Sequence, residues 1–314
     1  MRDYGDSDGD TFLEYAKMSD KGLVNQGWKD SWDAIAHENG RLAEPPIALS
    51  EVQAYGWWAY RAAADMALRM GEPAEAEIWE QAAGRLRTNF LERFWWPEED
   101  VFYIALDGQK QPVRTVSSNS GQCLWTGIAP EEWATAMVDR MMRPDMYTQW
   151  GIRTLSQHAL SYNPMSYHNG SVWPHDTAMV GAGFARYNRK AEAGQLLGNL
   201  FGVSLYYSGS RLPELFCGFT RAVGYGPTRY PVACAPQSWA AGAPFMLLSS
   251  VLGFEPEAEK QRLTLHDPQL PDWMHSLDLG DLKLGQQNLH MRFERSERGT
   301  SVILTGASEI EVHV

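Results

Sequence analysis

The chain has 314 residues, of which 44% are hydrophobic and 21% charged, and its formal net charge is −12. The acidic balance and the lack of basic runs argue against nucleic-acid binding, because phosphate backbones are bound by clustered Lys and Arg. No apolar run reaches 18 residues, so no transmembrane helix and no membrane partner are predicted.

The clearest predicted element is a pair of helices over 50–96. Ser50 and Gln53 have the spacing of a capping box and predict the start of a long helix. Gly71 suits the position just after its end. Pro73 suits the first turn of the next helix. Because the link between them is short, 50–96 predicts an antiparallel helical hairpin.

Further helices are predicted from the same periodicity of 3.6 residues. They cover 10–19, 119–127, 130–143, 173–187, 189–207 and 236–253. Polar segments rich in Gly and Pro separate them, at 25–46, 144–171 and 208–235. Ordered loops of this length in a compact domain are usually functional, so we expect the site there.

The pattern changes near residue 255. Apolar and polar residues then alternate with a period of two, as in "SLDLGDLKLGQQNLHMRFERS", which predicts four or five strands. The predicted fold is mainly α: an α/α toroid over 1–255 that resembles an (α/α)₆ barrel and carries catalysis, followed by a small β-rich unit over 256–314. A six-hairpin toroid needs twelve helices and the sequence predicts about eight. We therefore expect the C-terminal portion of a barrel that another chain or segment completes.

Aromatic residues are unusually frequent: 13 Trp, 13 Tyr and 11 Phe. A large aromatic core is one explanation. Sugar binding is the other, because the apolar C–H faces of pyranose rings stack on aromatic rings while their hydroxyls need polar neighbours. The segments "GWKDSW", "VWPHD" and "QSWA" place Trp beside polar residues, which favours a carbohydrate site.

Two carboxylates stand out in aromatic loops. Asp30 lies between Trp28 and Trp32, and the adjacent Lys29 can tune its charge. A helix N-cap or a plain surface carboxylate is the alternative role for Asp30. Glu214 lies in "RLPELFCGF", a mostly apolar setting that suits a general acid or a protected base.

The segment "YNPMSYHNGSVWPHD" is dense in groups that hydrogen-bond sugar hydroxyls. Tyr167, His168, His175 and Asp176 are such groups, and Trp173 is a candidate platform. His175 and Asp176 have an alternative role as caps of the helix that follows. The two histidines have no Cys or Glu partner at zinc spacing, so no metal is predicted.

Four motifs occur in an order that resembles the bacterial amylo-α-1,6-glucosidase, or glycogen-debranching-type, glycoside hydrolases. They are "GLVNQGWKDSWDAI", "SSNSGQCLWTGI", "NPMSYHNGSVWPHDTAMVGAGFARY" and "RLPELFCGF". The resemblance covers about residues 10–255. It implies an (α/α)₆ barrel and inverting hydrolysis without a cofactor, with Asp30 as general acid and Glu214 as general base. The implied substrate-binding residues are Gln26, Trp28, Lys29, Tyr167, His168, Trp173, His175, Asp176 and Trp239.

The expected function is hydrolysis of α-glucosidic bonds, with α-1,6 bonds foremost, in an oligosaccharide or glycogen-like substrate. Two other interpretations remain open: a non-catalytic sugar-binding remnant of such an enzyme, and a sugar epimerase that uses His168 and His175 as an acid–base pair. Three cysteines without metal spacing indicate a reduced protein, and hence a cytoplasmic location.

Overall fold

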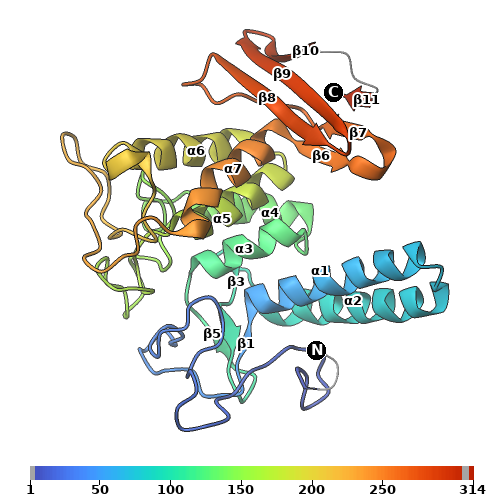
Figure 1. The fold of residues 1–314 in the computed structure, drawn as a ribbon. Coiled ribbons are helices and arrows are strands. Elements are labelled where there is room, and N and C mark those ends of the chain that lie inside the picture. The colour runs from blue at the N-terminus through green and yellow to red at the C-terminus, as the bar shows by residue number, and fades with distance from the viewer. Residues whose placement is uncertain (1–3, 306–310) are drawn as a thin grey trace.

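The α-helices lie in the first 252 residues of the chain and the longer strands follow them, as the colours of Figure 1 show. The fold comes from a computed structural model that describes residues 4–305 and 311–314. The α-helices of this part are α1 (Ser50–Arg69), α2 (Pro73–Phe94), α3 (Ser118–Thr126), α4 (Glu131–Met141), α5 (Pro174–Arg186), α6 (Lys190–Ser204) and α7 (Ser238–Leu252).

The helices pack as successive pairs. α2 lies against α1, α4 against α3 and α6 against α5, while α1, α3, α5 and α7 pack against one another in chain order. The hairpin predicted over 50–96 is confirmed by α1 and α2, which lie side by side in Figure 1. Gly71 has a φ of +80° at the turn, which suits glycine, and Pro73 opens α2.

Strands form two small sheets after α7. One sheet has the order β10-β9-β8 and the other β11-β7-β6, and only the pair of β11 with β7 is parallel. The strands are β6 (Phe254–Glu257), β7 (Arg262–Leu265), β8 (Ser276–Leu284), β9 (Gln287–Ser296), β10 (Gly299–Thr305) and β11 (Glu311–His313). The described part of the tail thus holds six strands, where four or five were predicted.

Two-residue strands before α1 and between α2 and α3 were not predicted. They are β1 (Ala48–Leu49), β2 (Trp95–Trp96), β3 (Val101–Phe102), β4 (Ala105–Leu106) and β5 (Pro112–Val113). β1, β4 and β5 form one sheet. A small apolar cluster, with Ile35, Ile47, Ile104 and Val113 buried in it, packs the segment after Asp30 against this sheet. The loop that carries Asp30 is therefore anchored by burial.

One larger apolar cluster runs from the helices into the C-terminal sheets. Phe90 of α2, Leu124 of α3, Leu247 of α7 and Phe293 of β9 belong to it and are fully buried. Because burial of apolar surface is the main force in folding, this shared core stabilises the helices and the sheets together. The division of the chain at residue 255 stays a prediction.

The helix predicted over 10–19 is wrong. Tyr15 forms a β-bridge with Ile47, with backbone N···O distances of 3.1 and 2.9 Å. The backbone N–H of Leu13 donates to the side-chain oxygen of Gln53 at 2.7 Å. These partners draw the segment into an extended path along the start of α1, so its backbone does not coil.

The capping box predicted at the start of α1 is also wrong. The N-cap residue is Leu49, and Ser50 lies inside the first turn. The amide of Gln53 donates to the carbonyl oxygens of Leu13 and Leu49, at 2.8 and 3.0 Å. Gln53 therefore ties the N-terminal segment to α1 and does not cap the helix.

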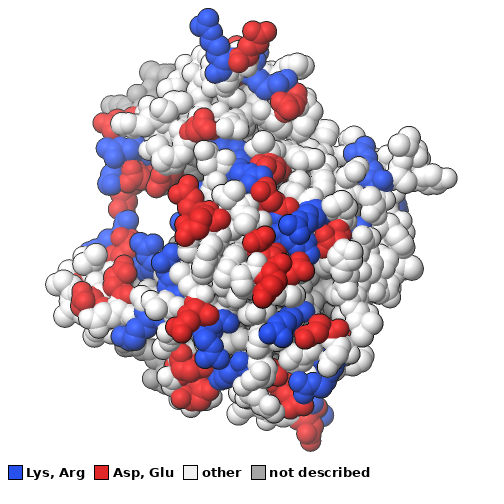
Figure 2. All heavy atoms as spheres, turned by 180° about the vertical axis from the view of Figure 1, so that it is seen from behind, with Lys and Arg blue, Asp and Glu red and all other residues white. Residues whose placement is uncertain are grey.

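Charged side chains of both signs are interspersed on the face shown in Figure 2, and no continuous basic patch covers that face. This distribution agrees with the acidic net charge of −12. None of the described helices has the length and apolar character that a membrane span requires.

Candidate active site

The N-terminal ends of four helices meet in one place. Glu51 in the first turn of α1 faces Asn119 of α3, and the charge of Asp176 in the first turn of α5 acts on Glu51. His175 of α5 stacks on Trp239 in the first turn of α7, with ring centroids 4.1 Å apart. Parallel helix N-termini point their backbone N–H groups the same way, toward the loops that precede them.

Aromatic rings gather above these helix ends. Trp28 meets His168, Trp173 and His175 edge to face, with centroid distances of 5.6, 5.7 and 5.1 Å. His168 stacks on Trp173 at 5.1 Å, and Trp239 completes the set by its stack on His175. We call these five side chains and Tyr167 the aromatic cluster. They come from two loops and from the first turns of α5 and α7.

Glu214 lies at the edge of the aromatic cluster, and its side chain is nearly buried. One carboxylate oxygen accepts a hydrogen bond from the Tyr167 hydroxyl at 2.7 Å, and the other accepts one from the backbone N–H of Cys234 at 3.1 Å. The Glu214 N–H in turn donates to the Cys234 carbonyl at 2.8 Å. These bonds hold the carboxylate in one orientation.

Asp30 lies next to His168. Its carboxylate is 4.0 Å from Nδ1 of His168, and the same nitrogen is 2.8 Å from the hydroxyl of Ser31. The Asp30 side chain is 52% exposed. No helix begins at Asp30, so the structure rules out its alternative role as an N-cap.

Tyr167 connects the two carboxylates. Its hydroxyl bonds Glu214, and its ring lies 4.6 Å from that of His168, the neighbour of Asp30. Burial raises the pKa of the Tyr167 hydroxyl, and the hydrogen bond and charge of Glu214 and the charge of Asp30 raise it further. Both carboxylates are therefore close enough to act on one phenol.

Lys29 turns away from Asp30, contrary to the prediction that it tunes the charge of Asp30. The side chain is buried, and its ammonium donates to the backbone carbonyl of Thr154 at 2.5 Å. Burial lowers the pKa of Lys29, while the charges of Asp176 and Glu51 raise it. Lys29 thus belongs to an ionic group that lies beneath the aromatic cluster.

Asp176 is fully buried in the same ionic group, and no side chain caps its helix. Gln122 of α3 donates to one oxygen of Asp176 and accepts from the hydroxyl of Tyr55. Burial raises the pKa of Asp176, and the charge of Lys29 lowers it. Sequence reasoning missed Glu51 and Gln122, although a Glu and a Gln among small apolar residues were a usable signal.

Two site loops are joined at glycines. The N–H of Gly218 donates to the carbonyl of Pro164 at 2.8 Å, and Nε of Arg153 donates to the Gly218 carbonyl at 2.7 Å. A Cβ on Gly218 would overlap the carbonyl oxygen of Gly170. Only glycine allows this approach, which fixes the loop of Glu214 against the loop of Tyr167.

The two histidines of the cluster are neutral at neutral pH. Burial lowers the pKa of His175 to about 4. Burial, with the charges of Lys29 and His175, lowers the pKa of His168 to about 3. A neutral imidazole can bind hydroxyls but is a poor proton donor, which weighs against an epimerase that uses these two side chains as acid and base.

Gln26 does not reach the aromatic cluster: it is exposed, and its amide donates to the Ala16 carbonyl at 3.2 Å. In the described part of the chain, one group of three carboxylates is close enough together to hold a metal ion: Asp6, Asp8 and Asp10. The ammonium of Lys110 lies 2.9 Å from Asp8 and 2.7 Å from Asp10, so a side-chain cation already pairs with two of the three.

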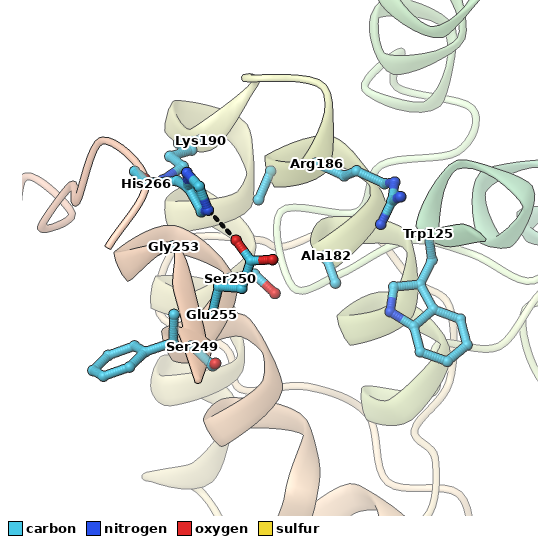
Figure 3. A pocket seen from close by; sticks show the side chains of 11 residues that line it. Trp125, Ala182, Arg186, Lys190, Ser249, Ser250, Gly253, Glu255 and His266 are labelled. Atoms are coloured by element: carbon cyan, nitrogen blue, oxygen red, sulfur yellow. Dashed lines mark hydrogen bonds and ion pairs between the residues drawn. The ribbon is translucent and has the colours of Figure 1, made fainter. Parts of the chain in front are cut away.

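A cavity of about 440 Å³ lies away from this site, near the C-terminal ends of α3, α5 and α7. Figure 3 shows Trp125 and Arg186 on one side of it and the ion pair of Glu255 with His266 on the other. Neither Asp30 nor Glu214 lines it. The two predicted catalytic residues therefore lie outside this cavity.

Comparisons with solved structures show the fold. A GH63 mannosylglycerate hydrolase from Thermus thermophilus in complex with glucose is 22% identical, with a TM-score of 0.52, over 64% of this chain and 45% of that one. Neutral trehalase from Saccharomyces cerevisiae is 15% identical, with a TM-score of 0.52, over 70% and 41%. A GH78 rhamnosidase from Bacillus sp. GL1 is 15% identical, with a TM-score of 0.68, over 98% and 28%.

The chain therefore spans less than half of each of these structures. They are glycosidases of the α/α-toroid type, so this part of the predicted fold is confirmed, while the incompleteness of the barrel stays a prediction. No curated protein sequence matches the chain.

A family model described as a mannosylglycerate hydrolase MGH1-like glycoside hydrolase domain matches residues 7–220, a range that includes Asp30 and Glu214. None of the comparisons singles out the amylo-α-1,6-glucosidases, so the predicted resemblance is confirmed only at the level of a glycoside hydrolase. The family match spans more than half of the chain, and the chain therefore belongs to the MGH1-like glycoside hydrolase family.

Proposed function

We propose that the chain is an inverting hydrolase of α-glucosidic bonds in oligosaccharides or glycogen-like glucans, with Asp30 as general acid and Glu214 as general base. Tyr167 carries this proposal. Its hydroxyl binds Glu214 at 2.7 Å, and its ring contacts His168, which lies beside Asp30. Two carboxylates from distant loops thus border one aromatic cluster. The α-1,6 preference rests on the resemblance of the motifs alone.

The reaction needs one proton donor and one proton acceptor. Asp30 gives its proton to the glycosidic oxygen as the bond from the anomeric carbon to that oxygen breaks. Glu214 takes a proton from a water molecule that attacks the anomeric carbon on the opposite face, so the product has inverted configuration. In inverting enzymes the two carboxyl groups stand about 6.5–9.5 Å apart to admit this water.

The aromatic cluster suits the sugar ring on which this reaction occurs. Trp28 and Trp239 are partly exposed and offer apolar faces and edges to the C–H groups of a pyranose. His175, which is neutral, is a hydrogen-bonding partner for its hydroxyls.

Trp173 and His168 were predicted to bind substrate, but both are almost fully buried and stack on each other, so we assign them to supporting the exposed rings. Lys29 and Asp176 lie too deep for exposed contact, and we assign them to holding the cluster in place.

The test compares single variants on an aryl α-glucoside. Asp30→Asn and Glu214→Gln should each lower kcat by about 10²–10⁴-fold, the usual contribution of general acid–base catalysis. Glu38→Gln, an exposed carboxylate later in the same loop as Asp30, is the matched control and should keep the wild-type kcat. The anomer formed first, followed by NMR, should be inverted. Wild-type kcat in either site variant refutes the proposal.

The same experiment decides the second candidate, a sugar-binding remnant without catalysis. The observation that favours it is the aromatic cluster, because stacking of a sugar on its rings requires neither Asp30 nor Glu214. Binding of maltooligosaccharides in calorimetry, with no release of glucose by the wild-type chain, is the result that a remnant gives.

We also propose that another chain or segment completes the barrel. α7 supports this: none of its residues is charged, and Phe245 on it is 75% exposed. A helix that is apolar all round is normally covered. Light scattering on the purified chain tests for a second copy, and a strictly monomeric mass excludes that copy as the cover. The cytoplasmic location stays a prediction.

A further inference from the structure

Trp32 differs from the other tryptophans of the chain. All 13 lie in the part of the chain that the structure describes. In twelve of them an aromatic ring or a cation packs against the indole. Trp239, for example, stacks on His175, and the half-exposed Trp273 stacks on Phe201. Trp32 has no such partner among the described residues, and it is 67% exposed. A single exposed apolar side chain is common on protein surfaces, so it is the position of Trp32, two residues after the proposed acid Asp30, that points to a ligand-binding role.

The backbone on both sides of Trp32 is nevertheless fixed. The carbonyl of Ser31 accepts from the amide of Asn25 at 2.7 Å and from the N–H of Ala34 at 3.1 Å. The carbonyl of Asp33 accepts from the amide of Asn169 at 3.2 Å. An exposed indole on a fixed backbone loses little conformational freedom when a ligand stacks on it. This arrangement is typical of a prepared binding surface.

The place of Trp32 decides which part of a substrate it meets. It follows Asp30 by two residues, so the two Cα atoms lie within about 7 Å of each other. The proposed acid protonates the glycosidic oxygen, and the leaving group is bonded to that oxygen. Glu214 acts on the opposite face of the cleaved ring. An aromatic surface beside Asp30 therefore meets the leaving group.

The charge around Trp32 selects the kind of leaving group. Asp30 and Asp33 flank it, and the only cation nearby in sequence, Lys29, is buried and bound to the Thr154 carbonyl. A leaving group with a carboxylate or phosphate is repelled there by the Asp33 carboxylate, and Lys29 is not free to pair with it. An uncharged pyranose has an apolar face for the indole and hydroxyls that can donate to the Asp33 carboxylate.

We propose that Trp32 forms the leaving-group subsite and that the leaving group is an uncharged pyranose ring, so that the substrate is a neutral oligosaccharide. This inference rests on the proposed function. It adds a specificity residue outside the aromatic cluster, and it excludes short organic acids as the preferred leaving group.

Calorimetry in a Glu214→Gln background tests this inference without turnover. In that background the chain should bind isomaltose, two α-1,6-linked glucose units, more tightly than glucose. A second change, Trp32→Ala, should weaken isomaltose binding about tenfold, as expected for one aromatic stack, and leave glucose binding as it was. Trp32→Phe should restore part of the loss. Trp273→Ala, at another half-exposed indole, is the matched control and should change neither value.

The outcomes separate this inference from the proposed function. Equal weakening of glucose and isomaltose by Trp32→Ala, or no weakening of either, overturns the leaving-group subsite. Isomaltose bound no better than glucose also overturns it. Hydrolysis of α-glucosyl fluoride by the chain with native Glu214 is measured separately. Its leaving group, fluoride, cannot stack on Trp32, so this reaction tests catalysis without the leaving-group subsite. If that reaction fails while the binding result holds, the proposed function falls and the sugar subsite stands.

Discussion

Replacement of Tyr167 by Phe removes one hydroxyl from the site and leaves its ring. The hydroxyl donates to Glu214 at 2.7 Å. A hydrogen bond to a charged group contributes about 1.5–3 kcal/mol, and Tyr167 is only partly buried, so we take the lower end. If the bond holds the base in place for the transition state, about 1.4 kcal/mol corresponds to a tenfold loss in kcat.

The assay is steady-state kinetics of Tyr167→Phe on an aryl α-glucoside. We expect kcat to fall about tenfold while KM changes little, because the lost contact is with the base and not with the substrate. Tyr230→Phe is the matched control. The Tyr230 ring lies 5.7 Å from that of Tyr167, and the Tyr230 hydroxyl has no hydrogen-bond partner among the described residues. It should keep the wild-type kcat.

Two results would refute this reasoning. An unchanged kcat in Tyr167→Phe means that the Cys234 N–H alone holds Glu214. A rise in KM at constant kcat means that the hydroxyl binds the sugar, which is the role that the sequence predicted for it.

Three further predictions concern the buried surroundings of the site. Lys29→Met leaves buried Asp176 without its cation and should lower the free energy of unfolding in urea by about 3–5 kcal/mol. The double variant Lys29→Met, Asp176→Asn should regain part of this free energy. If the losses of the two single variants simply add in the double variant, the pairing is contradicted. Gly218→Ala forces its Cβ onto the Gly170 carbonyl, so stability should fall by about 1–3 kcal/mol and kcat with it; an unchanged melting temperature contradicts this. The pKa of His175 is lowered to about 4, so its contribution to stability is complete above pH 6.5 and falls by about 1.4 kcal/mol per pH unit as the pH drops toward 4. In denaturant titrations at several pH values, His175→Phe should remove this part of the dependence of the unfolding free energy on pH. An unchanged dependence contradicts the prediction.

Local signals explain which elements the sequence predicts well. α1 and α2 were predicted because Gly71 and Pro73 act on the backbone within one turn, whatever lies around them. The helices α3 to α7 also fall within about four residues of their predicted bounds, since periodicity is a local property. Such signals place the loops, and with them the proposed acid and base.

Long-range partners explain the errors. Gln53 has the spacing of a capping residue, but Leu13 and Leu49 offer its amide better partners. Lys29 was expected to tune the charge of Asp30, because the two residues are adjacent in the chain. Its partner is Asp176, which lies far away in sequence and reaches it only through the packing of α5 against α3. No local pattern carries that information.

The burial of the two carboxylates offers an argument that neither the motifs nor the fold provides alone. The side chain of Asp30 is 52% exposed, while Glu214 is 8% exposed and bound by two donors. A general base must confine one water molecule, which a closed position favours. A general acid must reach the glycosidic oxygen, and the leaving group on that oxygen departs toward solvent. An open position beside Trp32 favours this role. The asymmetry therefore supports Asp30 as the acid and Glu214 as the base, and not the reverse.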